Sequence, residues 1–100
     1  MYRHGDVGVV PARMPEGAEK MQREGDLILA YGEVTGHAHR IKSGTVQMWS
    51  AGARRYITVE EPADLTHEEH GTITLAPGAY EVVIQREHDY LTELPRAVAD

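Results

Sequence analysis

Short runs of β-branched and aliphatic residues, each closed by a turn signal after about 6–12 residues, constrain the fold of this chain most strongly. In residues 27–31, for example, the alternating positions Leu27, Leu29 and Tyr31 are typical of a half-buried strand. Similar runs cover residues 5–12, 37–41, 45–50, 54–60, 72–75 and 79–85, and a weaker one covers 18–24. We therefore expect a mainly β protein, a small barrel or sandwich of six to seven short strands.

One segment departs from the strand pattern. Thr66 is a suitable helix N-cap, and Glu69 follows it three positions later, as in a capping box. We therefore expect one short helical turn near residues 65–70. The chain contains no internal repeat, low-complexity tract or linker, which predicts a single small β domain over residues 1–100.

The composition excludes several classes of protein. Hydrophobic residues at 41% and charged residues at 26% are typical of a globular protein rather than a disordered or fibrous one. Because there is no cysteine, the chain has no disulfide and no thiolate metal site. No apolar run approaches the roughly 20 residues of a membrane-spanning helix, and the N-terminus does not resemble a signal peptide. We expect a cytoplasmic protein without a membrane partner.

The charge and the size of the core predict the kind of partner. A net charge of −6 leaves no overall basic footprint, which argues against binding to duplex DNA. A chain of 100 residues without phenylalanine can build only a limited apolar core. We therefore expect a homodimer, with Trp49, Tyr56 and Tyr80 available for a shared face.

Four of the six histidines occur in two pairs, and these are the main candidates for a functional site. His37 and His39 alternate along a predicted strand, which sets them on one face about 7 Å apart. His67 and His70 lie three positions apart, on one side of the expected helical turn. His4 and His88 stand alone, and we expect them to be surface residues without a role in the site.

Two chemistries fit the paired histidines. Imidazoles hold divalent Zn, Ni, Cu or Fe, and the HxH and HxxH spacings suit a metal site in a β-barrel. Alternatively, histidines act as general base and general acid on a phosphodiester, because both protonation states are accessible near neutral pH. In that second case Glu69 would orient an imidazole, and Arg40, Lys42 and Thr35 would bind the substrate.

Residues 3–7, 31–39, 60–70 and 75–80 resemble the small ring nucleases linked to type III CRISPR antiviral defence, which also occur in phages and plasmids. The resemblance covers the chain from Arg3 to about Tyr90 and implies cleavage of cyclic oligoadenylate second messengers. It assigns no catalytic residue. Together with the histidine chemistry, it predicts a ribonuclease that acts on cyclic oligoadenylate or short RNA through attack by the ribose 2′-hydroxyl, without metal or other cofactor. The catalytic residues of that prediction are His37, His39, His67, His70 and Glu69.

Two alternatives remain open. One is a histidine-rich metal-binding β-barrel protein, cupin-like, which is either a metal-dependent enzyme or not catalytic. The other is an interaction protein whose histidines lie on its surface.

Overall fold

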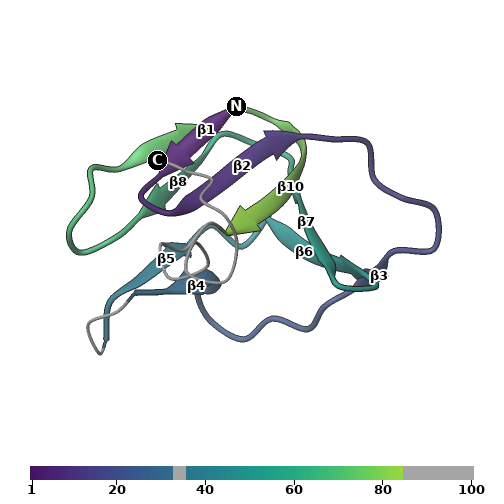
Figure 1. Cartoon of the computed structure of the whole chain (residues 1–100), viewed down its shortest axis with the longest axis horizontal. Coiled ribbons are helices and arrows are strands. Elements are labelled where there is room, and N and C mark those ends of the chain that lie inside the picture. Colours follow the sequence, from purple (N-terminus) through teal and green to yellow (C-terminus); the bar gives the residue numbers. More distant parts are fainter. Residues whose placement is uncertain (33–35, 85–100) are drawn as a thin grey trace, which may run out of the picture.

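Ten short strands form the described part of this computed structural model, which covers residues 1–32 and 36–84 (Figure 1). They are β1 (Tyr2–His4), β2 (Val7–Pro11), β3 (Glu19–Lys20), β4 (Leu27–Tyr31), β5 (Ala38–Ile41), β6 (Gln47–Ala51), β7 (Arg54–Val59), β8 (Ala63–Thr66), β9 (Ile73–Leu75) and β10 (Gly78–Ile84). The predicted mainly β fold is confirmed, with ten strands in the described residues rather than six to seven.

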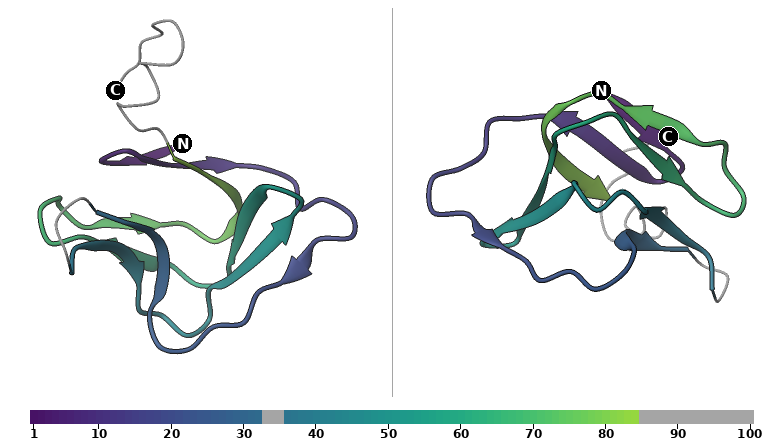
Figure 2. Two further views of the ribbon diagram at one scale, coloured as in Figure 1. Left: turned by 60° about the horizontal axis from the view of Figure 1, so that its bottom comes forward. Right: turned by 180° about the vertical axis from the view of Figure 1, so that it is seen from behind.

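The strands pair into two antiparallel sheets. The larger sheet has the order β1-β2-β10-β7-β6-β3, and the smaller has the order β4-β5-β8-β9. Strand β1, at the edge of the larger sheet, lies beside β9, at the edge of the smaller one (Figures 1 and 2). The two sheet edges therefore meet on the side of the molecule that carries the N-terminus.

Residues from both sheets share one apolar core. Alternation along each strand points every second side chain inward, so that β-branched and aliphatic residues fill the space between the sheets. The fully buried members include Val7, Val9, Leu29, Ile41, Val46, Ile57, Leu65 and Leu75. This common core fixes the position of the smaller sheet relative to the larger one.

The prediction of a helical turn near residues 65–70 is wrong. Leu65 and Thr66 belong to β8, in which Ala63 and Leu65 are buried and Asp64 is exposed. That alternation has the period of a strand, and β8 pairs with β5 on one side and β9 on the other. The capping pattern at Thr66 and Glu69 was a purely local signal, and burial of Leu65 in the core overrides it.

In place of the single strand predicted over residues 5–12, the chain begins with a hairpin of β1 and β2. His4 pairs with Val7, so β1 and β2 are joined by the two residues Gly5 and Asp6. Gly5 has a φ of +64°, a value that glycine adopts without steric cost at the first position of a two-residue hairpin turn. This turn carries His4 and Asp6 to the end of the hairpin.

Two of the three aromatic residues expected at a dimer face lie inside the chain. Tyr56 and Tyr80 are each only 5% exposed, so they are not available to a partner. Trp49 is partly buried and donates a hydrogen bond from Nε1 to Thr58 Oγ1 at 3.1 Å. The homodimer therefore stays a prediction, and Tyr56 and Tyr80 no longer support it.

In residues 1–32 and 36–84, no helix has the length and apolar character needed to cross a membrane.

Candidate functional site

Five histidines gather where the edge of the larger sheet meets the smaller sheet. His4 ends β1, His39 lies in β5, His37 directly precedes β5, and His67 and His70 lie between β8 and β9. The ring centroids of His39 and His67 are 4.3 Å apart, those of His67 and His70 are 4.6 Å apart, and those of His4 and His39 are 4.9 Å apart. The two predicted histidine pairs are thus brought together.

The prediction that His4 is a surface residue is wrong, because it is 2% exposed and contacts the paired histidines. In the sequence, the one feature that marks His4 is its position before the Gly5-Asp6 turn. That position does not reveal the distant histidines that His4 contacts. His88 lies outside the described residues.

Strand register explains why His39 and His67 meet. In the pairing of β5 with β8, Arg40 is opposite Thr66 and Ile41 is opposite Leu65. Continued by one residue, the same register sets His39 opposite His67, at the short distance typical of cross-strand neighbours. Beyond them, the Ala38 amide donates a hydrogen bond to Glu68 Oε1 at 2.9 Å, which holds the start of the β8–β9 loop against β5.

A chain of hydrogen bonds defines which nitrogen of His39 is free. His4 Nε2 lies 2.9 Å from the carbonyl oxygen of Gly71, which only accepts, so His4 Nε2 carries a hydrogen. A neutral His4 therefore accepts at Nδ1, and its 2.8 Å partner there, His39 Nδ1, is the donor. This leaves His39 Nε2 with a free lone pair.

Burial keeps these two imidazoles neutral. Desolvation, reinforced by the neighbouring histidines, lowers the pKa of His39 from 6.5 to about 4. Desolvation also lowers the pKa of His4, against the opposing effect of its hydrogen bond to Gly71. At neutral pH the lone pair of His39 Nε2 is therefore present in nearly every molecule.

Three of the imidazoles are placed to share one ion. His39, His67 and His70 each offer a ring nitrogen, and these three atoms lie within 4.8 Å of one another. His39 is buried, His67 is half-buried and His70 is exposed, so the group opens to solvent on one side. His67 Nδ1 accepts a hydrogen bond from the Glu69 amide at 2.9 Å. An ion would either replace that amide at Nδ1 or bind Nε2 in the other tautomer.

His37 lies at the margin of this group. Its ring centroid is 5.8 Å from that of His67, and its Nδ1 lies 2.9 Å from Glu69 Oε2, without the alignment of a hydrogen bond. Glu69, predicted to orient an imidazole, therefore stands next to His37 rather than His39.

The predicted phosphate-binding residues are not assembled around the histidines. Arg40 contacts the Gly36 carbonyl, Glu68 and Asp26, at 3.1, 3.4 and 3.7 Å, and strand alternation points it away from His39. The hydrogen bond from the Ala38 amide and, to a lesser degree, the charge of Arg40 stabilise the carboxylate form of Glu68 and so lower its pKa. Thr35 lies outside the described residues.

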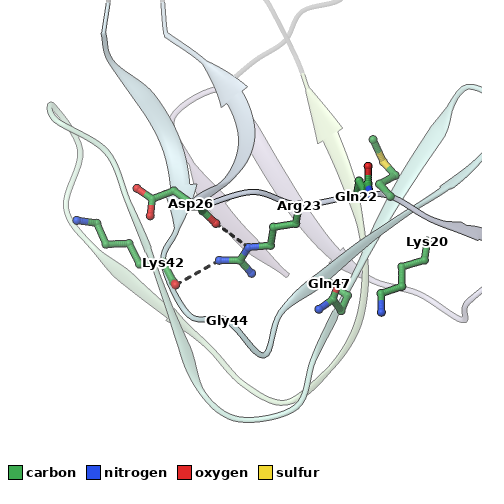
Figure 3. A pocket seen from close by; sticks show the side chains of 9 residues that line it. Lys20, Gln22, Arg23, Asp26, Lys42, Gly44 and Gln47 are labelled. Carbon is green, nitrogen blue, oxygen red and sulfur yellow. Dashed lines mark hydrogen bonds between the residues drawn. The ribbon is translucent and has the colours of Figure 1, made fainter.

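Lys42 lines a separate cavity of about 600 Å³, with Lys20, Met21, Gln22, Arg23, Gly25, Asp26, Gly44 and Gln47 (Figure 3). Among the described residues, no histidine lines this cavity. Arg23 spans it and donates hydrogen bonds to the carbonyls of Gly25, Ile41, Lys42 and Val46, so its guanidinium ties neighbouring loops together. We therefore assign Arg23 a structural role, because its hydrogen bonds hold the β5–β6 connection in place.

Gly5 is required for the position of His70. A Cβ at Gly5 would lie 2.6 Å from His70 Nε2, closer than Cβ atoms approach non-bonded neighbours, so Gly5→Ala should displace the imidazole. If the three-histidine group holds Zn²⁺, the affinity should fall by about tenfold or more, in the range for perturbed support of a metal ligand. Isothermal titration calorimetry of the purified variant measures this.

Gly52→Ala is the matched control. Gly52 has nearly the same φ, +63°, but nothing lies within 4 Å of its Cβ position. Both variants should lose a similar stability, about 1–2 kcal/mol, because alanine is strained at positive φ. Equal zinc affinities in the two variants would contradict the placement of His70 in the site.

Comparison with known proteins identifies the family but no activity. Searches among curated proteins and among solved structures found no match. Residues 3–85 match a family described as a domain of unknown function, DUF8820. The match spans both sheets and includes all five clustered histidines. The chain therefore belongs to the DUF8820 family.

Proposed function

We propose that this protein binds one divalent transition-metal ion through His39, His67 and His70. The observation that carries the proposal is the convergence of three imidazole nitrogens within 4.8 Å. Three histidines that leave one side open are typical of catalytic rather than structural zinc sites. Imidazole ligands suit Zn, Ni, Cu and Fe alike.

The distances require a small movement of the ligands. Two ligand nitrogens about 2.0–2.1 Å from a zinc ion, at the tetrahedral angle, lie about 3.4 Å apart. Contraction from at most 4.8 Å is therefore needed. His67 and His70 lie in the loop between β8 and β9, which can close toward the strand-held His39. We expect metal binding to fix this loop.

The hydrogen bond from His39 to His4 supports the proposal independently. Metal-binding histidines commonly donate their second ring N–H to a fixed acceptor, which sets the tautomer and the orientation of the ring. His4 supplies that acceptor to His39, and the Gly71 carbonyl in turn fixes His4. The lone pair of His39 Nε2 is thereby oriented before an ion arrives.

An ion held in this way would act on a ligand from the solvent side. A divalent metal with an open position lowers the pKa of a bound water or polarises a phosphoryl or carbonyl oxygen. His37 and Glu69, at the exposed margin, are placed to exchange protons with a molecule bound there. A metal-dependent hydrolase is the activity that this arrangement fits best.

Metal-free cleavage of a cyclic oligoadenylate or short RNA is the second candidate. His39 Nε2, oriented by His4, favours it, because a general base needs a positioned lone pair. A pKa of about 4, however, makes His39 a weak base at neutral pH. Arg40, the predicted phosphate ligand, is paired with carboxylates instead. Both points favour the metal site.

Metal titration of the full chain tests the proposal. We expect protein stripped with EDTA to take up one Zn²⁺ or Ni²⁺ per chain, by calorimetry and elemental analysis. Absence of stoichiometric binding for these ions, and for Co²⁺ and Fe²⁺, would overturn it.

A panel of cyclic oligoadenylates and linear RNAs, assayed with and without EDTA, separates the two candidates. Under the first, cleavage disappears in EDTA and returns with one metal. Cleavage that persists in EDTA supports the second. The relation to ring nucleases, the homodimer and the cytoplasmic location stay predictions.

A further inference from the structure

The geometry points to Asp6 as the fourth protein ligand, so that the ion is held by three imidazoles and one carboxylate, and a water or substrate would take a fifth position. This inference rests on the proposed function and goes beyond it, since it fixes the donor set and with it the class of ion. Asp6 was not among the site residues predicted from the sequence. It enters through the hairpin turn that follows His4.

The direction of the hydrogen bonds leaves a gap between Asp6 and His39. His39 Nε2 lies 3.4 Å from Asp6 Oδ1. In the tautomer that His4 and Gly71 impose, Nε2 has a lone pair and no hydrogen. An ionised carboxylate also only accepts. Two acceptors that face each other repel unless a proton or a metal ion lies between them.

The separation matches a shared metal ion. The 3.4 Å between these two atoms equals the distance expected for a nitrogen and an oxygen bound to one zinc ion at the tetrahedral angle, about 3.4 Å. No contraction is needed on this side of the site. His39 and Asp6 are thus a preformed half, and His67 and His70 supply the half that closes.

The position of Asp6 brings the carboxylate to the same edge as His70. Asp6 occupies the second position of the β1–β2 turn, directly after Gly5. His70 Nε2 is the atom nearest to the Cβ position of Gly5, at 2.6 Å. Asp6 thus contacts His39 and directly follows the glycine that lies against His70, and its side chain is about one-third accessible to solvent.

One carboxylate among three imidazoles selects the ion. A hard, charged oxygen favours divalent Zn, Fe, Ni or Mn and disfavours copper(I), which prefers sulfur ligands. It also leaves a bound divalent ion with a single net positive charge, which suits a site open to water. We infer that the physiological ion is divalent.

Substitution of Asp6 tests the inference. Asp6→Asn keeps the size of the side chain and fits the same turn position, but removes the charge. We expect it to weaken Zn²⁺ binding by about 100-fold or more, because loss of a direct ligand should exceed the roughly 10–100-fold effect of an outer partner. The matched control is Asp64→Asn, an exposed carboxylate of the smaller sheet that accepts a hydrogen bond from Thr74. It should bind Zn²⁺ within about threefold of the wild type.

The spectrum of bound Co²⁺ gives a second readout. Replacement of a direct ligand changes the d–d bands, whereas loss of a remote charge leaves them unchanged. If wild type and Asp6→Asn bind the metal equally well and give the same Co²⁺ spectrum, Asp6 is not a ligand, and the proposed metal site itself still stands. A wild type that binds no metal would instead overturn the proposed function. Asp6→Glu, with a longer carboxylate, keeps the test valid if Asp6→Asn fails to fold, and should shift the Co²⁺ bands.

Discussion

His39→Ala is expected to abolish measurable zinc binding. Loss of an outer partner of a metal ligand costs about 10–100-fold in affinity, so loss of the buried ligand itself should cost more than 100-fold. His39 is the most constrained of the three proposed ligands, because it lies in β5, is 2% exposed and has its tautomer fixed by His4. Competition with a chromophoric chelator measures the affinity.

Two further variants make this result specific. His4→Ala removes the acceptor for His39 Nδ1–H but no ligand, so it should weaken binding by about 10–100-fold. His37→Ala, two residues from His39 and outside the three-histidine group, should change the affinity less than His4→Ala does. If His37→Ala is instead the variant that loses metal, the ligand set is wrong.

The metal-free protein is expected to lose stability as the pH falls from about 6.5 to 4. The pKa of His39 is about 4 in the folded chain and 6.5 in the unfolded chain, because burial disfavours the imidazolium. As the pH falls below 6.5 the unfolded state takes up a proton first, which shifts the equilibrium toward unfolding. The loss is complete below about pH 4 and amounts to roughly 2–4 kcal/mol.

Urea denaturation in EDTA at several pH values measures this loss. His39→Gln removes the titrating group, so the difference in unfolding free energy between wild type and variant isolates the contribution of His39 from that of the carboxylates. This difference should shrink as the pH falls from 7 to 4. A difference that stays constant over this range would show that His39 is not desolvated in the folded chain.

The two histidine pairs illustrate how far local patterns reach. Strand alternation predicted that His37 and His39 face the same way, and both rings contact His67 in the structure. The spacing of His67 and His70 predicted that they are neighbours, and they are, with ring centroids 4.6 Å apart. It did so for the wrong reason, since the segment forms a strand end and a loop rather than a helical turn.

The candidate site itself depends on contacts between distant residues. His4 and His39 are 35 positions apart, and His4 and Gly71 are 67 apart. No periodicity within a strand contains such information, because it depends on strand register and on which sheet edges meet. The same holds for Arg40, whose neighbour His39 suggested a phosphate ligand. In the structure, Arg40 instead forms ion pairs with Asp26 and Glu68.

The sequence by itself determined the class of fold, because alternation of apolar residues between turn signals leaves an antiparallel β architecture as the arrangement that buries one face of every strand. It also made histidine the leading candidate for a functional site, since the chain has no cysteine and its histidines are grouped. Only the tertiary structure decided which histidines meet, that His4 and Asp6 join them, and that Arg40 and Lys42 do not. The physical reason is that side-chain alternation is a property of each strand, whereas the pairing of β5 with β8 and the meeting of β1 with β9 come from the packing of the whole core.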